Sequence, residues 1–304
     1  MDGAGMIELP DGLTSRGATL DDIDMITELV AICELDADGV ADVDRDDFVS
    51  GFARMGFDKA VDMLLVFDGD APVAWAEVYR GRAEADVIPS HRGRGLGSAL
   101  RTWTEERARA LGLPDVGQTK TDADLAAKAL FLSNGYEPTY TSWMIRKPLD
   151  GPQARPDVPP GIQIRPFEDR DARAAHRVID AAFCEWPDRD PDPFDSWVNV
   201  VRHPAFAPEL SPLAFEGDEL VGVLLAYDYP EVGEGWVQQL ATEANHRHRG
   251  IARAMLRTAF GSFRERGRSR AGVSTDSRTG ALDLYEKLGM RVERSYTRYT
   301  KRLT

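Results

Sequence analysis

Two short segments of the chain combine arginine with glycine or alanine at the same spacing. Residues 92–97 read Arg-Gly-Arg-Gly-Leu-Gly, and residues 247–252 read Arg-His-Arg-Gly-Ile-Ala. Both fit Arg-x-x-Gly-x-(Gly/Ala), and both begin a helical pattern. The first peptide nitrogens of a helix have no partner within the helix, and the helix dipole makes that end positive. Each segment therefore predicts a site for an anion such as a pyrophosphate.

The residue types in these segments suit close contact with such a ligand. Glycine and alanine leave the backbone nitrogens uncovered, and Arg92 and Arg247 add a charged hydrogen-bond donor at the rim. The predicted anion-binding residues are Arg92, Gly93, Arg94, Gly95, Leu96 and Gly97 in the first segment, and Arg247, His248, Arg249, Gly250, Ile251 and Ala252 in the second.

One aromatic position differs between two otherwise similar downstream stretches. Phe131 is followed by Gly135, and Tyr285 is followed by Gly289, at the same spacing. The anion-binding segments lie 155 residues apart (247 − 92), and the aromatic residues lie 154 apart (285 − 131). Two motifs that recur at a nearly constant distance indicate a duplicated domain. Because a tyrosine hydroxyl can donate a proton and phenylalanine cannot, the sequence predicts proton chemistry in the second copy only.

Each copy has the sequence pattern of a mixed α/β domain. After a short strand and an amphipathic helix come two apolar strands around a glycine-centred turn, at 68–70 and 216–218, which predicts a β-hairpin. A further strand precedes each anion-binding segment, and a long helix follows it, at about 95–111 and about 250–266. This order predicts two tandem domains, each with a mixed, largely antiparallel sheet flanked by helices.

A proline-rich segment separates the two copies. Residues 147–161 contain five prolines, and proline removes hydrogen-bond donors and fixes φ, so the segment is predicted to be an extended linker. We therefore expect an N-terminal domain at 1–147, a linker at 148–160 and a C-terminal domain at 161–304.

The composition limits the possible partners. The 304 residues carry a formal net charge of −14, which disfavours nucleic acid and anionic membranes and tolerates a cationic substrate such as an amine. The longest apolar runs are far shorter than the roughly 20 residues of a membrane span. Cys33 and Cys184 are too few for a disulfide framework or a metal site. With no signal peptide visible, we expect a cytoplasmic, metal-free protein that is a monomer or a weak homodimer.

These motifs resemble those of the GCN5-related N-acetyltransferase (GNAT) family. The resemblance rests on both anion-binding segments and on residues 281–290, and it covers the chain as a tandem pair of domains. It implies that the anion is the pyrophosphate of acetyl-CoA and that a small-molecule amine is acetylated. It also implies that the strand end before each segment pairs its backbone with the pantetheine arm, which concerns Asp86, Val87 and Ile88 in the first copy and Leu240, Ala241 and Thr242 in the second.

The resemblance also implies catalytic roles. Tyr285 would be the general acid that protonates the departing thiolate, since a phenol with a pKa of about 10 is protonated at neutral pH. The first copy, which carries Phe131, would be catalytically degenerate. A carboxylate on or beside the strand is expected to accept the amine proton, and Glu234 is the first candidate, ahead of Glu243 and Asp228.

Other readings of the sequence stay open. Residues 184–197 mix acids, aromatics and prolines, which suits recognition of a cation-bearing amine and equally a solvated loop. Both copies could bind acyl-CoA without turnover, as a sensor or scaffold. Alternatively, the first copy could serve only as an interaction module that completes a pseudo-symmetric pair. The hydroxyl of Tyr285 favours the enzyme.

Overall fold

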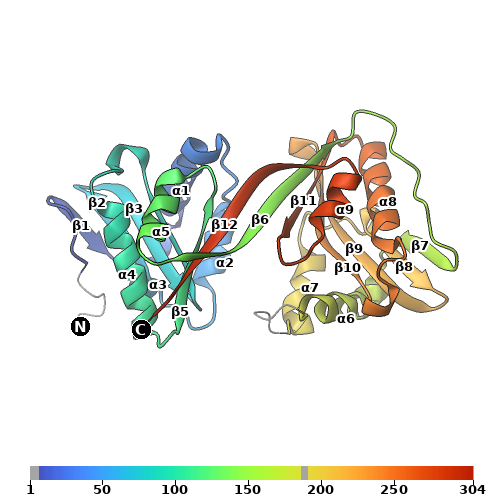
Figure 1. Ribbon diagram of the computed structural model, residues 1–304, viewed down its shortest axis with the longest axis horizontal. Helices are drawn as coiled ribbons and strands as arrows, with labels where there is room; N and C mark the ends of the chain where they lie inside the picture. Colours follow the sequence, from blue (N-terminus) through green and yellow to red (C-terminus); the bar gives the residue numbers. More distant parts are fainter. Residues whose placement is uncertain (1–6, 186–190, 304) are drawn as a thin grey trace. The chain divides into compact units, whose positions relative to one another are not determined.

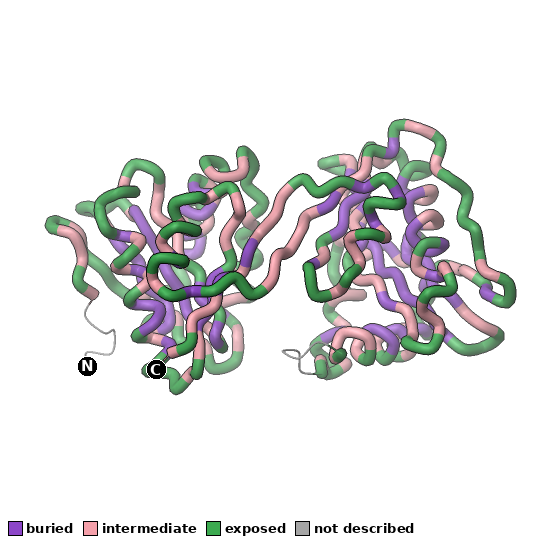
Figure 2. Tube along the Cα trace, viewed as in Figure 1, coloured by how far each residue is buried: buried purple, intermediate pink, exposed green. Residues whose placement is uncertain are grey.

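The computed structural model describes residues 7–185 and 191–303, and the chain forms two compact units. In each unit the central strands form a sheet with helices on both faces (Figure 1). The two faces of each sheet carry separate hydrophobic cores. Buried positions follow the central strands and the helix sides that face them (Figure 2). Within the described ranges, no helix is both long enough and apolar enough to cross a membrane.

The first half of the chain supplies six strands and five helices to the described structure. Its elements are β1 (Leu13–Arg16), α1 (Ile23–Asp38), α2 (Arg45–Phe52), α3 (Lys59–Asp62), β2 (Met63–Asp68), β3 (Ala71–Tyr79), β4 (Arg82–Val87), α4 (Leu96–Ala110), β5 (Asp115–Thr121), α5 (Leu125–Ser133) and β6 (Glu137–Pro148).

The second half repeats this order, apart from the short α3. Its elements are β7 (Ile162–Pro166), α6 (Ala172–Phe183), α7 (Phe194–Arg202), β8 (Pro212–Glu216), β9 (Glu219–Tyr229), β10 (Glu234–Thr242), α8 (Ile251–Glu265), β11 (Arg270–Asp276), α9 (Leu282–Lys287) and β12 (Arg291–Arg302). The predicted hairpins are β2–β3 and β8–β9, and the predicted long helices are α4 and α8.

The strand pairing confirms the predicted mixed sheet. β1 to β4 and β7 to β10 pair antiparallel, whereas β4 pairs parallel with β5 and β10 parallel with β11. The parallel pairing is short and ends at Ala83↔Gln118 in one unit and at Val237↔Val273 in the other. Beyond these pairs the two strands run toward the anion-binding segment without a shared ladder, so the facing strand edges no longer pair with each other.

The last strand of each unit comes from the other half of the chain. β12 pairs with β5 from Tyr296 onward, and β6 pairs with β11 from Ser142 onward. The compact units are therefore residues up to Thr141 together with those from Arg294, and Ser142–Glu293. The expected ranges 1–147 and 161–304 do not describe these units, because an unpaired sheet edge can be covered by any strand of matching length. Residues 149–161 contain neither helix nor strand, as expected for a linker.

Each unit begins with the same ion pair between an arginine and an aspartate. Arg16 donates to both carboxylate oxygens of Asp22 at 2.8 and 2.7 Å, and Arg165 does so to Asp171 at 2.7 and 2.8 Å. Both aspartates are buried and precede the first helix of their unit. The guanidinium of Arg16 lowers the pKa of Asp22 to about 2.

We expect Asp22→Asn to destabilise the first unit at neutral pH and to have little effect in acid. A carboxyl whose pKa is lowered in the folded state stabilises above its unfolded pKa of about 4, and this contribution is lost as the pH falls toward 2. The loss at pH 7 should be about 2 kcal/mol. Denaturant melts at pH 7 and pH 2.5 check this, and an equal loss at both values would show that the charge is not responsible.

Candidate active site

The turn into α4 and the turn into α8 have the same backbone geometry. Gly95 and Gly250, immediately before the helices, have φ of +91° and +87°. Residues with a Cβ are strained in this left-handed region, so glycine permits the sharp turn from strand to helix. The turn leaves the first backbone nitrogens of each helix at the helix end, where they can contact an anion.

Arginine holds the start of each turn in place. Arg92 Nε donates to the carbonyl oxygen of Val87 at 3.0 Å, and Arg247 Nε donates to that of Thr242 at 3.1 Å. Arg92 Nη1 also pairs with Asp36 at 2.5 Å, and both Nη atoms of Arg247 pair with Glu185 at 2.8 Å. These arginines were expected to add a charged donor at the rim. In the structure they tie the strand end to the turn and to the first helical region.

A cavity of about 730 Å³ lies along the second anion-binding segment. All nine residues predicted to contact the coenzyme in the second copy line it, and so does Tyr285; the nine are Leu240, Ala241, Thr242, Arg247, His248, Arg249, Gly250, Ile251 and Ala252. Residues from a strand, a turn and a helix thus share one cavity, and their contact with the coenzyme stays a prediction. The cavity is formed by the end of β10, the turn into α8 and the residues from Thr279 through α9.

The corresponding cavity of the first unit is smaller, about 340 Å³. Of the predicted residues, Asp86, Val87, Arg92, Gly93, Gly95 and Gly97 line it. Ile88, Arg94 and Leu96 do not: Ile88 and Leu96 pack in hydrophobic cores, and Arg94 is exposed to solvent. Phe131 occupies the position that Tyr285 has in the other unit.

Tyr285 lies where two cavities of the second unit meet. The second cavity, of about 570 Å³, extends toward the end of α6 and toward β11. The two cavities share lining residues at the end of β10 and around α9, among them Thr242, Ala281 and Tyr285. The side chain of Tyr285 is 4% exposed, and burial raises its pKa above the ordinary value. The phenol therefore keeps its proton over the whole physiological pH range.

Glu234 is held away from both cavities. It lies at the opposite end of β10 and lines neither of them. Its carboxylate, in a side chain that is 4% exposed, accepts from Arg146 Nε at 2.6 Å and faces Arg270 at 3.1 Å. This placement contradicts the expectation that Glu234 serves as the base. The sequence places Glu234 on the strand, but strand position alone does not show which end of β10 reaches the cavity. The alternatives Asp228 and Glu243 also lie outside both linings.

We expect Glu234→Gln to lower stability and to leave turnover nearly unchanged. Removing the charge leaves two arginines without their buried partner, which costs about 3 kcal/mol. A shift of the denaturation midpoint together with a kcat within threefold of the wild-type value would confirm a structural role. A kcat more than 100-fold lower in a folded variant would restore Glu234 as the base.

The second cavity also contains residues that the sequence did not single out. Asp276, whose carboxylate pairs with Arg278 at 2.8 Å, lines it together with Glu185. Gln239 also lines it and accepts from Trp197 Nε1 at 2.9 Å. Within the segment 184–197, residues 186–190 lie outside the described residues. Asp276 is the last residue of β11 and carries no motif, so only the fold brings it here.

A mixed sheet whose parallel strands separate beside a glycine-capped helix, present twice, is the architecture of an acyl-CoA-dependent acetyltransferase. The profile of the acetyltransferase (GNAT) family matches residues 26–136 and 172–290, which is more than half of the chain. The chain belongs to this family. The predicted family and tandem fold are thus confirmed, and acetyl transfer from an acyl-CoA is its class of activity.

Relatives named mycothiol acetyltransferase match most of the chain. The protein from Thermobispora bispora is 27% identical, covering 87% of this chain and 89% of its own, and that from Nocardia farcinica is 29% identical, covering 88% and 89%. A GCN5-related N-acetyltransferase from Sphaerobacter thermophilus is 30% identical, has a TM-score of 0.79 and covers 97% of each chain. A tandem GNAT protein from the clavulanic acid biosynthesis pathway, 15% identical, shares the fold with a TM-score of 0.72 and covers 96% and 99%.

Proposed function

We propose that the second unit acetylates the primary amine of a small molecule, with acetyl-CoA as the donor and Tyr285 as the general acid. The supporting observation is the place of this tyrosine at the junction of two adjoining cavities. One cavity has the helix N-terminus that suits a pyrophosphate. The other is open to an acceptor molecule. Tyr285 therefore lies where the thiolate of CoA would leave, and its hydroxyl is a proton donor for that thiolate.

The residues present fit this donor. The cavity along α8 offers backbone nitrogens without Cβ cover at Gly250 and a short side chain at Ala252. The end of β10 from Leu240 to Thr242, which lies beyond the pairing with β11, would pair with the pantetheine arm. Acetyl-CoA supplies an activated thioester carbon.

The proposed reaction in the second unit has three parts. The neutral amine forms a bond to the carbonyl carbon, the carbon–sulfur bond breaks, and the Tyr285 hydroxyl gives its proton to the sulfur. Among the described residues that line the acceptor cavity, the carboxylates Glu185 and Asp276 are paired with arginines. The amine is therefore expected to lose its proton to solvent before or during attack, rather than to a dedicated carboxylate.

The named relatives suggest a narrower alternative. Most of this chain aligns with proteins called mycothiol acetyltransferase, so the unacetylated form of mycothiol is the first acceptor to test. The residue eight positions before Arg247, on β10, is Gln239, so this position offers no carboxylate that could accept the amine proton. The broader assignment to a small-molecule amine does not depend on this choice.

A thiol-release assay with acetyl-CoA and a panel of amines tests the proposed function. The panel should include unacetylated mycothiol, amino sugars and amino-terminal peptides. Release of CoA that depends on one amine class supports the enzyme. If the coenzyme binds and no amine causes release, the non-catalytic sensor or scaffold is the better description.

A further inference from the structure

Two cations of the second unit lie near each other on β6 and α8. They are Lys147 and Arg257, and both side chains are half-buried. Lys147 follows the core residue Ile145 by two positions, so it lies on the sheet face that packs against α8. Its Nζ is 5.8 Å from the ring centroid of Phe260, which lies one turn after Arg257 on the same side of the helix. The two charges thus share the rim of the interface between β6 and α8.

Lys147 uses one of its three hydrogen-bond donors within the described structure. Its Nζ donates to the carbonyl oxygen of Leu288, just after α9, at 2.6 Å. An ammonium group carries three donors, so two remain for another partner. Burial, followed by the charge of Arg257, lowers the pKa of Lys147, and no carboxylate of the described residues opposes these two causes.

Arg257 has no counter-charge of its own. Among the described residues it forms no ion pair, and its buried Nε has no hydrogen-bond partner. An unpaired buried donor destabilises the folded state, and a second positive charge nearby adds to that cost. The arrangement therefore calls for an anion that the protein does not supply.

The first unit supplies a carboxylate at the corresponding place. Lys301 on β12 has the position that Lys147 has on β6, since each lies opposite the second residue of the neighbouring strand. Lys301 Nζ is 3.0 Å from a carboxylate oxygen of Glu105, a buried residue of α4 that also pairs with Arg101. The residue 155 positions after Glu105, at the same place on α8, is Phe260. The counter-charge present in the first unit is thus replaced by an apolar ring in the second.

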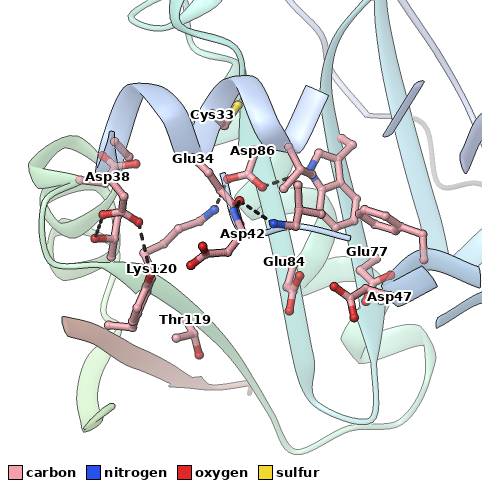
Figure 3. A pocket seen from close by; sticks show the side chains of 18 of the residues that line it. Cys33, Glu34, Asp38, Asp42, Asp47, Glu77, Glu84, Asp86, Thr119 and Lys120 are labelled. Carbon is pink, nitrogen blue, oxygen red and sulfur yellow. Dashed lines mark hydrogen bonds and ion pairs between the residues drawn. The ribbon is translucent and has the colours of Figure 1, made fainter. Parts of the chain in front are cut away.

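Other half-buried cations of the first unit also have carboxylate partners. Lys120 pairs with Asp86, as Figure 3 shows, and Arg107 pairs with Asp62 at 2.6 Å. Lys147 and Arg257 depart from this pattern, because two positive charges come together there without an acid.

We propose that Lys147 and Arg257 together bind a phosphate ion at the rim between β6 and α8. A phosphate dianion balances both positive charges. Its oxygens suit the planar fork of a guanidinium and the point charge of an ammonium group. Neither residue lines the coenzyme cavity, so this site is separate from the one expected to hold the pyrophosphate. The binding does not depend on the reaction proposed for the second unit.

Thermal denaturation of the full chain in inorganic phosphate tests the proposal. At pH 8 and constant ionic strength, chloride is replaced stepwise by phosphate. The melting temperature of the wild type should rise with the phosphate concentration, because the folded state binds the ion, and this dependence gives the Kd.

Three variants on α8 separate the site from general attraction to positive charge. Arg257→Met should weaken phosphate binding at least about tenfold, whereas Arg257→Lys keeps the charge and should stay within about threefold of the wild type. Arg264→Met removes the same charge from an exposed position on α8 and should leave the Kd unchanged. Without phosphate, Arg257→Met should melt at or above the wild-type temperature, because it relieves the repulsion from Lys147.

Ala252→Glu distinguishes this site from the anion-binding turn at the start of α8. It places a negative charge in the coenzyme cavity, so phosphate binding at the rim should stay within about threefold of the wild type. Loss of phosphate binding in Ala252→Glu, equal Kd values for the wild type and Arg257→Met, or no rise of the wild-type melting temperature would overturn the inference.

Discussion

Replacing Tyr285 by phenylalanine is expected to lower kcat about 100-fold to 1,000-fold and to leave the Kd for acetyl-CoA within twofold. The ring stays in place, so the packing around α9 is kept, and only the proton for the departing thiolate is lost. Proton transfer by a positioned group is worth about 10² to 10⁴-fold. Steady-state thiol release with the best amine of the panel, together with calorimetry, measures both quantities.

Tyr136→Phe is the matched control for this experiment. Tyr136 is also buried, but it belongs to the first unit and lines neither cavity of the second. Its kcat should equal that of the wild type. Because burial raises the pKa of Tyr285, wild-type activity should not decline as the pH rises from 8 to 10 through loss of this proton. Full turnover by Tyr285→Phe would remove the tyrosine from the mechanism.

Introducing a carboxylate at the start of α8 should weaken coenzyme binding in the second unit about 100-fold. Ala252 is half-buried and lines the cavity that follows the glycine turn. In Ala252→Glu, a negative charge faces the expected pyrophosphate, and like-charge contact costs about 3 kcal/mol, or about 100-fold in affinity. The helix itself should lose no stability, since an acidic residue in the first turn suits the dipole. The KM for acetyl-CoA and the melting temperature measure the two effects.

Ala252→Gln separates charge from size. It places a neutral side chain of nearly the same volume at the same position, and its KM for acetyl-CoA should rise much less than in Ala252→Glu. The equivalent change in the first unit, Gly97→Glu, should reduce the number of coenzyme sites found by calorimetry without changing turnover. An equal rise of the KM for acetyl-CoA in Ala252→Glu and Ala252→Gln would show that the side chain acts by its size, and that no anion binds at this position.

Local patterns in the sequence predict most of the fold. Apolar runs on either side of glycine-centred turns predict the hairpins. Gly95 and Gly250 mark the strand-to-helix turns because few other residues tolerate their backbone angles. The duplication is visible because turn chemistry and the aromatic–glycine spacing recur together. These features depend on neighbours within a few residues, which a sequence displays directly.

Long-range partners are what the sequence does not display. β6 and β12 are both twelve residues long, and nothing in their patterns shows which sheet edge each one covers. The role of Glu234 depends on Arg146, which is 88 residues away along the chain. The carboxylates of Glu77 and Glu84 lie opposite each other because of the register of β3 and β4. A slip of one residue would separate them.

The account depends on the backbone nitrogens at the starts of α4 and α8 binding a pyrophosphate. Calorimetric titration of the wild-type protein with CoA and with pantetheine, which lacks the pyrophosphate and the nucleotide, tests this most directly when repeated with Ala252→Glu. We predict that CoA binds at least 100-fold more tightly than pantetheine and that Ala252→Glu removes this advantage in the second unit. Equal affinities for the two ligands, or an advantage of CoA that Ala252→Glu leaves intact, would contradict the account.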